Sequence, residues 1–168
     1  IVPTAVPLET LATLRNEPGV MLWVDLDSPT EEEIKLVMET GFALHPLVIE
    51  DCMSDTPFPK LEEYDDYLYL VMHAVDFSHK DKFTTTELDL VLGKNFIATF
   101  HRLPLKPIQA AIDRYQRNHS LTVRGPDRIT HTILDLMVEN YKPAIEELRR
   151  DLEKIEGHVL RGGVGTEI

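Results

Sequence analysis

Apolar residues recur every three or four positions over the last quarter of the chain, and this pattern constrains the fold more than any other feature. The positions are Ile129, Ile133, Met137, Tyr141, Ile145, Leu148, Leu152, Ile155 and Val159. Such spacing predicts an amphipathic helix, and a run of about thirty residues approaches the length of a coiled-coil seam. Pro143 lies in the middle, so it should either kink one helix or start a second one packed back on the first. We expect long antiparallel helices over about residues 126–160, followed by a flexible, glycine-rich terminus over 161–168.

The preceding part of the chain alternates strand-like and helix-like segments. Segments rich in β-formers predict strands over residues 20–26, 67–77, 88–92 and 96–101, with a turn at 93–95 between the last two. Helices are predicted over about 29–40, where Ser28 and Glu31 form a capping box, over a short segment from Pro46, and over about 105–118. This order predicts the α/β (α+β) class, with a mixed β-sheet sandwiched by helices. Residues 1–160 are expected to form a single domain, with the sheet in about 1–122.

The charge balance excludes some partners and favours others. The chain has 17 basic and 29 acidic residues, which gives a net charge of -12. Such a field repels nucleic acid and anionic lipid and attracts cations. No apolar run reaches the roughly 20 residues that span a bilayer, so this polypeptide is expected to be soluble as given. Its start at Ile1 suggests a piece of a longer protein, and the single cysteine, Cys52, suits a reducing compartment.

Two adjacent carboxylates are the leading candidate site. Glu50 and Asp51 offer hard oxygen ligands, which suit Mg²⁺, Ca²⁺ or Mn²⁺ better than zinc. Two neighbouring carboxylates do not complete a site, so a third ligand must come from elsewhere. His131, Asp135 and Glu139 follow one another at intervals of four and would share one helix face, which could supply it. The competing interpretation is that this face is simply solvated, which is the commoner case for acidic helix residues.

The sequence offers little that is typical of an enzyme. Cys52 has no neighbouring His and Asn that would indicate nucleophilic catalysis, and the histidines lack zinc spacing. Asp25 and Asp27 are interpreted as turn and cap residues at a strand end. A soluble enzyme using Glu50, Asp51 and Asp135 on Mg²⁺ as a Lewis acid stays open as an alternative, as does a helical interaction module over 129–159.

Several motifs, taken in order, resemble one known family. They are Trp23-Val24-Asp25-Leu26, His45-Pro46-Leu47-Val48-Ile49-Glu50-Asp51, Pro59-Lys60-Leu61-Glu62-Glu63-Tyr64-Asp65-Asp66-Tyr67-Leu68, Gly93-Lys94-Asn95-Phe96, Gly125-Pro126-Asp127 and Ile133-Leu134-Asp135. Over about residues 20–160 the chain is similar to the cytoplasmic domain of CorA-type Mg²⁺/Co²⁺ transporters. The ordered set is far more specific than any one motif.

The resemblance implies a regulatory domain rather than an enzyme. It implies a homopentameric transporter in the cell inner membrane, with this domain on the cytoplasmic side and regulatory Mg²⁺ bound between subunits. Asp51 would bind a cation with a carboxylate from the next subunit's stalk helix, and Glu50 and Asp135 would contribute to a second, adjacent site. The stalk, the membrane helices and the Gly-Met-Asn pore signature are absent from this sequence. We therefore expect weak, millimolar Mg²⁺ binding here. Zinc-transporting relatives share the architecture, so the transported cation stays open.

Overall fold

A five-stranded mixed sheet forms the centre of the computed structural model, which describes residues 7–56, 58–76, 84–117 and 125–160. The strands are β1 (Leu22–Asp27), β2 (Lys60–Glu63), β3 (Tyr67–Asp76), β4 (Thr84–Gly93) and β5 (Phe96–His101). Their order in the sheet is β1-β5-β4-β3-β2, in which β1 runs parallel to β5 and every other neighbouring pair is antiparallel. The expected mixed sheet and four of its strands are therefore confirmed.

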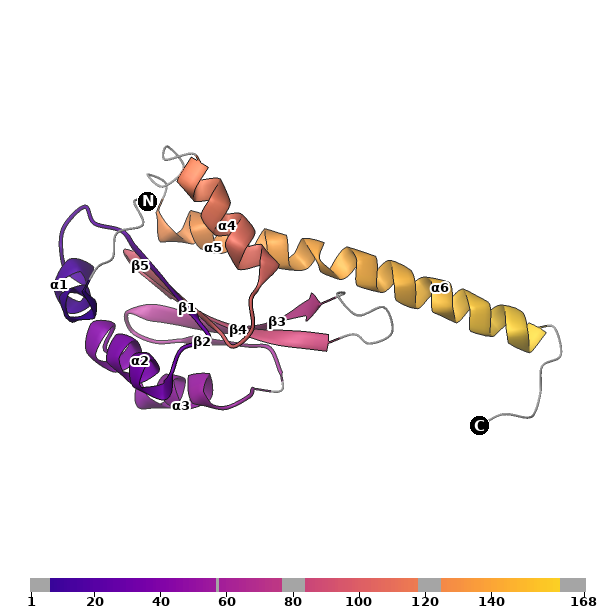
Figure 1. Cartoon of the computed structure of the whole chain (residues 1–168), viewed down its shortest axis with the longest axis horizontal. Coiled ribbons are helices and arrows are strands. Elements are labelled where there is room, and N and C mark those ends of the chain that lie inside the picture. Colours follow the sequence, from indigo (N-terminus) through magenta and orange to yellow (C-terminus); the bar gives the residue numbers. More distant parts are fainter. Residues whose placement is uncertain (1–6, 57, 77–83, 118–124, 161–168) are drawn as a thin grey trace.

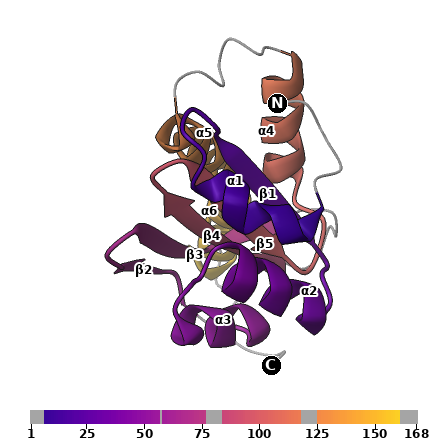
Figure 2. The same cartoon turned by 90° about the vertical axis from the view of Figure 1, so that its left-hand side faces the viewer.

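Helices cover both faces of this sheet (Figures 1 and 2). On one face lie α1 (Leu11–Arg15) after a short 3-10 turn (Leu8–Thr10), α2 (Glu31–Lys35), a π-helical segment (Leu36–Gly41) and α3 (Pro46–Met53). On the other face lie α4 (Lys106–Arg117) and α5 (Pro126–Glu139), and α6 (Tyr141–Leu160) leads away from the body. The predicted α/β class, with helices on both sides of a mixed sheet, is confirmed.

Strand alternation divides the core into two layers. Successive side chains of a strand point to opposite faces, so Val24 packs into the layer beneath α1–α3 while Trp23 packs into the layer beneath α4 and α5. Every residue of β5 is buried because β5 lies inside the sheet and both of its faces are covered. Asp25 and His101 fall on the α4 side, at the carboxyl ends of the two parallel strands.

The C-terminal helices differ from the expected antiparallel pair. Helix α6 runs on from α5 with Asn140 between them and extends away from the sheet instead of packing back (Figure 1). The physical reason is the position of Pro143 in the first turn of α6, where a missing backbone N–H breaks no helical hydrogen bond. The expected flexible terminus over 161–168 lies outside the described residues.

Some local features also differ from expectation. The capping box before α2 is formed by Thr30 and Glu33, not by Ser28 and Glu31. Ser28 cannot cap this helix because its φ of 51° is left-handed, whereas Thr30 has the extended backbone that an N-cap needs. The sequence patterns also missed the short α1 and β2. None of the helices in the described ranges has both the length and the apolar character needed to cross a bilayer.

Candidate cation site on helix α3

Helix α3 turns its two carboxylates away from the core. Its N-terminus is fixed by His45, whose Nδ1 accepts a hydrogen bond from Leu47 N–H at 3.3 Å, and Pro46 occupies the first turn. Helical spacing then places three side chains in the core and the carboxylates between them outside. The buried ones are Val48, Ile49 and Cys52. Glu50 is exposed and the Asp51 side chain is 29% exposed, so both carboxylates are accessible to a cation at the last turn of α3.

Asp51 already carries a positive partner within the chain. The Lys60 ammonium, from the start of β2, donates a hydrogen bond to Asp51 Oδ2 and lies 3.3 Å from Glu62 Oε1. Burial acts to lower the pKa of Lys60, but its contacts with Asp51 and Glu62 outweigh this and raise it, so the ammonium stays charged. A depression of about 580 Å³ opens here, lined by Leu47, Asp51, Lys60, Glu62, Glu63 and Tyr64. Sequence reasoning named Asp51 but missed its two companions, although all three lie in the motifs that carry the resemblance.

A buried polar chain lies directly beneath α3. The Cys52 thiol is 3.9 Å from the Tyr69 hydroxyl, which donates a hydrogen bond to Asp89 on β4. Burial, followed by the negative charge of Asp89, raises the pKa of the Cys52 thiol far above its ordinary value. A thiol held in its neutral form is a poor nucleophile, so the surroundings of Cys52 do not activate it for nucleophilic attack.

The structure does not bring the three predicted ligands together within one chain. Glu50 and Asp51 lie on α3, whereas Asp135 lies on α5 across the sheet, where its carboxylate is 3.2 Å from His131 Nδ1. Among the described residues, no group of three or more His, Cys, Asp or Glu side chains is arranged to hold a metal ion. Asp51 and Glu50 thus have the oxygen chemistry that Mg²⁺ prefers, but their own chain supplies an incomplete set of ligands in the described ranges.

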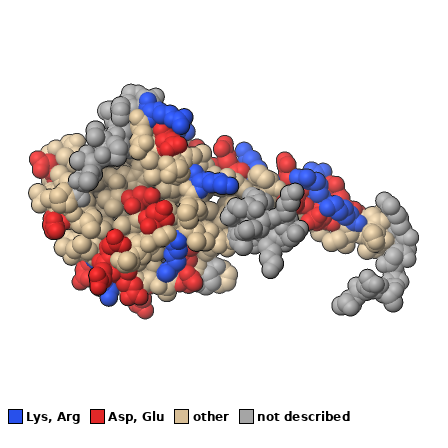
Figure 3. Space-filling model, viewed as in Figure 1, with Lys and Arg blue, Asp and Glu red and all other residues tan. Residues whose placement is uncertain are grey.

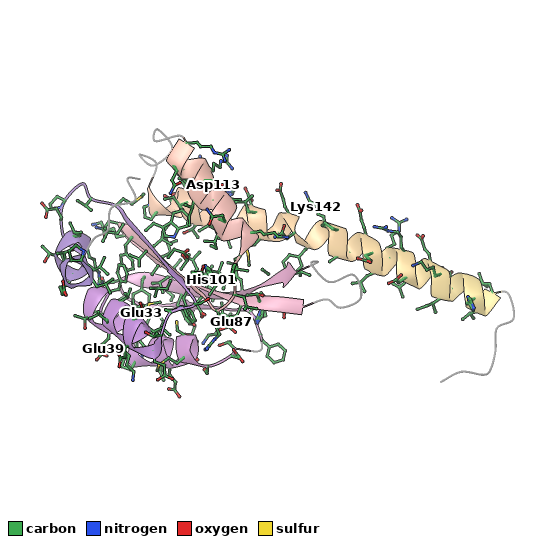
Figure 4. All side chains as sticks on the ribbon, in the orientation of Figure 1. Glu33, Glu39, Glu87, His101, Asp113 and Lys142 are labelled. Carbon is green, nitrogen blue, oxygen red and sulfur yellow. The ribbon has the colours of Figure 1, made fainter. Side chains whose placement is uncertain are left out.

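A second polar cluster lies at the carboxyl ends of β1 and β5, where the sequence indicated turn and cap residues. His101, labelled in Figure 4, is the last residue of β5. Its Nε2 lies 3.4 Å from Asp25 Oδ1, and its Nδ1 is 2.9 Å from the carbonyl oxygen of Leu103. Burial acts to lower the pKa of His101, but Asp25, the Leu103 carbonyl and Asp27 together raise it above 6.5. The cluster borders a cavity of about 510 Å³ below the start of α4. The carboxyl ends of parallel strands are a common place for binding sites. The sequence did not predict this cluster because Asp25 and His101 are far apart in the chain and meet only through the pairing of β1 with β5.

Surface charge differs between the body and the long helix. Figure 3 shows acidic side chains gathered in patches over the body, whereas basic and acidic side chains alternate along α6. The mixed pairs on α6 include Arg149 with Glu153 and Lys154 with Asp151. Excess negative charge therefore lies on the part of the molecule that carries α3.

Comparison with known proteins identifies the family. The family model described as CorA-like Mg²⁺ transporter protein matches residues 18–164. A Bacillus subtilis protein named as a metal ion transporter, YfjQ, is 34% identical over 134 residues, which is 80% of this chain and 41% of that protein. The cobalt/magnesium transport protein CorA of Thermotoga maritima is 22% identical over 142 residues, covering 82% of this chain and 40% of that protein. The chain thus spans about two fifths of the length of these relatives.

A solved structure shows the same fold. The soluble domain of CorA from Methanocaldococcus jannaschii matches with a TM-score of 0.60 at 23% identity, over 83% of this chain and 56% of that one. The mixed sheet, the helices on its two faces and the long C-terminal helix are therefore features of a known domain. Together with the family match over most of its length, they show that this chain belongs to the CorA-like Mg²⁺ transporter family.

Proposed function

We propose that this chain is the cytoplasmic, cation-sensing domain of a divalent-cation transporter in the cell inner membrane. The observation that carries the proposal is the position of Asp51. Its carboxylate lies at the end of α3, faces away from the core and is already paired with a positive group, the Lys60 ammonium. Two further observations support a cation as the partner. The chain belongs to a family of Mg²⁺ transporters, and its net charge of -12 attracts cations.

The cations are proposed to bind between neighbouring copies of the protein. Asp51 would share one Mg²⁺ with a carboxylate of the next subunit in a homopentamer. Glu50 and Asp135 would share a second one across an interface. The location of α3 and α5 on opposite faces of the sheet supports pairing between subunits over pairing within one chain. Co²⁺ would serve at the same oxygen ligands.

Electrostatic repulsion would drive the response to the cation. At high internal Mg²⁺ the bound cations neutralise facing carboxylates and hold the ring closed. At low Mg²⁺ the carboxylates repel each other, the subunits separate and the pore opens. Two like charges about 4 Å apart repel by roughly 4 kcal/mol at an effective dielectric of 20. Several interfaces together would then be sufficient to bias a gate whose states differ by a few kcal/mol.

Flux measurements on the full-length protein in liposomes test this proposal. Uptake of Mg²⁺, Co²⁺ and Zn²⁺ identifies the transported cation and separates a zinc-transporting member from a magnesium-transporting one. Internal Mg²⁺ should inhibit uptake by the wild-type protein and should inhibit the Asp51→Asn variant much less. Asp113→Asn, which removes a carboxylate on α4, is the matched control and should keep normal inhibition. Equal inhibition of wild type and Asp51→Asn would contradict the role of Asp51.

A further inference from the structure

Lys60 and two carboxylates form a compact arrangement at the edge of α3. Lys60 and Glu62 are two positions apart on β2, so their side chains point to the same side of the strand. The Lys60 ammonium contacts Asp51 Oδ2 and lies 3.3 Å from Glu62 Oε1. One positive group is therefore shared by two carboxylates from different elements, at the mouth of the depression described above.

The structure also holds the Lys60 side chain in place. Its ammonium lies 5.2 Å from the centre of the Tyr69 ring, within the range of a cation–π contact. The Tyr69 ring is itself fully buried, and its hydroxyl is fixed by Asp89. Glu62, the second carboxylate that contacts Lys60, accepts a hydrogen bond of 3.0 Å from the Tyr64 hydroxyl through its other oxygen. With 26% of its side chain exposed, Lys60 is positioned on Asp51 more firmly than a typical surface lysine would be.

We propose that Lys60 is a tethered competitor for the divalent cation at Asp51. When Mg²⁺ is scarce, its single positive charge is shared between Asp51 and Glu62, which leaves a net negative charge at the site, and Mg²⁺ must displace the ammonium in order to bind. Lys60 would thereby set the concentration at which the site responds. The inference rests on the proposed function and names a regulating residue of that same site, with Glu62 as a second carboxylate that faces the incoming cation.

Displacement is chemically reasonable at this position. Lysine carries a compact charge on a flexible four-carbon stem, so its ammonium can turn outward to water while the backbone of β2 stays in place. A divalent cation brings twice the charge to the same carboxylates, and Mg²⁺ keeps part of its water shell when it binds. The competition is between a tethered single charge and a free double charge, so removal of the tethered charge should shift the balance strongly toward Mg²⁺.

Calorimetric titration of the 168-residue chain with MgCl₂, and Mn²⁺ titration followed by electron paramagnetic resonance, test the inference. Lys60→Met keeps a long unbranched side chain and removes the charge, so it should bind Mg²⁺ and Mn²⁺ about tenfold more tightly than wild type. Adding Asp51→Asn to Lys60→Met should remove the gain, and adding Glu62→Gln should reduce it. Lys142→Met removes the same charge from α6 (Figure 4) and should change affinity less than twofold. Lys60→Arg keeps the positive charge and should bind like wild type.

The outcomes separate this inference from the proposed function. If Asp51→Asn weakens binding but Lys60→Met binds no more tightly than wild type, Lys60 is not a competitor and the proposed function stands. If Asp51→Asn changes binding neither in the wild-type chain nor in Lys60→Met, Lys60 has no cation site to compete for and the inference is overturned, while the flux test on the full-length protein decides the proposed function separately. Equal gains in Lys60→Met and Lys60→Arg would indicate a structural effect and overturn the competition. A folded Lys60→Met chain with no detectable binding would also overturn it.

Discussion

The Tyr69 hydroxyl donates a hydrogen bond of 2.5 Å to Asp89 Oδ1, beneath the helix that carries Asp51. The other carboxylate oxygen, Asp89 Oδ2, is buried and has no hydrogen-bond partner among the described residues. Burial, opposed by the Tyr69 hydrogen bond and reinforced by Glu87, raises the pKa of Asp89 to about 7. The core below the candidate site thus contains a carboxyl group that changes charge near neutral pH.

The stability of the chain should therefore fall as the pH rises toward neutrality. Because the pKa of Asp89 is raised from 3.8 to about 7, the folded state binds a proton that the unfolded state releases between these values. The contribution of Asp89 to the free energy of unfolding decreases over this range and is lowest above pH 7. In Asp89→Asn the uncharged amide removes this dependence. When the pH is raised from about 4 to about 8, the melting temperature of this variant should fall less than that of wild type.

Asp113→Asn provides the control for this measurement, because Asp113 is a more exposed carboxylate paired with Arg117 on α4. It should leave the pH profile of the wild type unchanged. A slope for Asp89→Asn identical to that of wild type would show that Asp89 does not titrate in the folded protein.

His101 should titrate with a pKa above the ordinary value of a histidine. Since its folded pKa is raised above 6.5, His101 stabilises the fold fully below that value and loses this contribution as the pH rises through its folded pKa. Asp25→Asn removes the main group that raises the pKa and should lower it, as measured by NMR titration of the imidazole protons. Asp27→Asn, which removes a more distant charge, should lower it less. An unchanged titration in Asp25→Asn would contradict the assigned ion pair.

Much of the fold could be predicted because its signals are local. Strands β1, β3, β4 and β5 carry runs of β-formers, and the spacing on α3 and α4 sets which residues are buried. Strand β2 has four residues, three of them charged, and exists because it pairs with β3. The contact between Lys60 and Asp51 depends on that pairing, so it could not be read from the sequence. The burial of Asp89 was equally hidden, because an alternating strand looks half-exposed until helices cover both faces.

The turn between β4 and β5 should tolerate no side chain at Gly93. A Cβ atom there would lie 2.0 Å from Cε1 of Phe96, whose buried ring stacks on Phe42 with the ring centres 4.5 Å apart. Gly93→Ala should therefore lower the free energy of unfolding by about 1–3 kcal/mol, as measured by urea denaturation. The neighbouring exposed substitution Lys94→Ala should cost less than about 0.5 kcal/mol. Equal stability of the two variants would contradict the packing described here.

The apolar stripe of α6 should affect assembly and not folding. Its residues Ile145, Leu148, Leu152, Ile155 and Val159 are at least half exposed, whereas Ile133 on α5 is fully buried. We expect the isolated chain to be a monomer or a loose dimer through residues 145–159, as measured by light scattering. Leu148→Glu with Leu152→Glu should abolish any dimer and leave the unfolding free energy nearly unchanged. Ile133→Ala should lower it by about 2–5 kcal/mol. A stable pentamer at low ionic strength would refute this prediction.

Limited proteolysis of the full-length protein with and without Mg²⁺ tests the proposed cation-sensing role of Asp51 most directly. Wild type should resist the protease in Mg²⁺ and become sensitive without it. Asp51→Lys places a fixed positive charge at the site and should stay resistant in both conditions. Asp51→Asn removes the ligand and should lose the protection that Mg²⁺ gives. Mg²⁺-dependent resistance that is the same in wild type and both variants would show that Asp51 is not the sensor and would leave Glu50 and Asp135 as the remaining candidates.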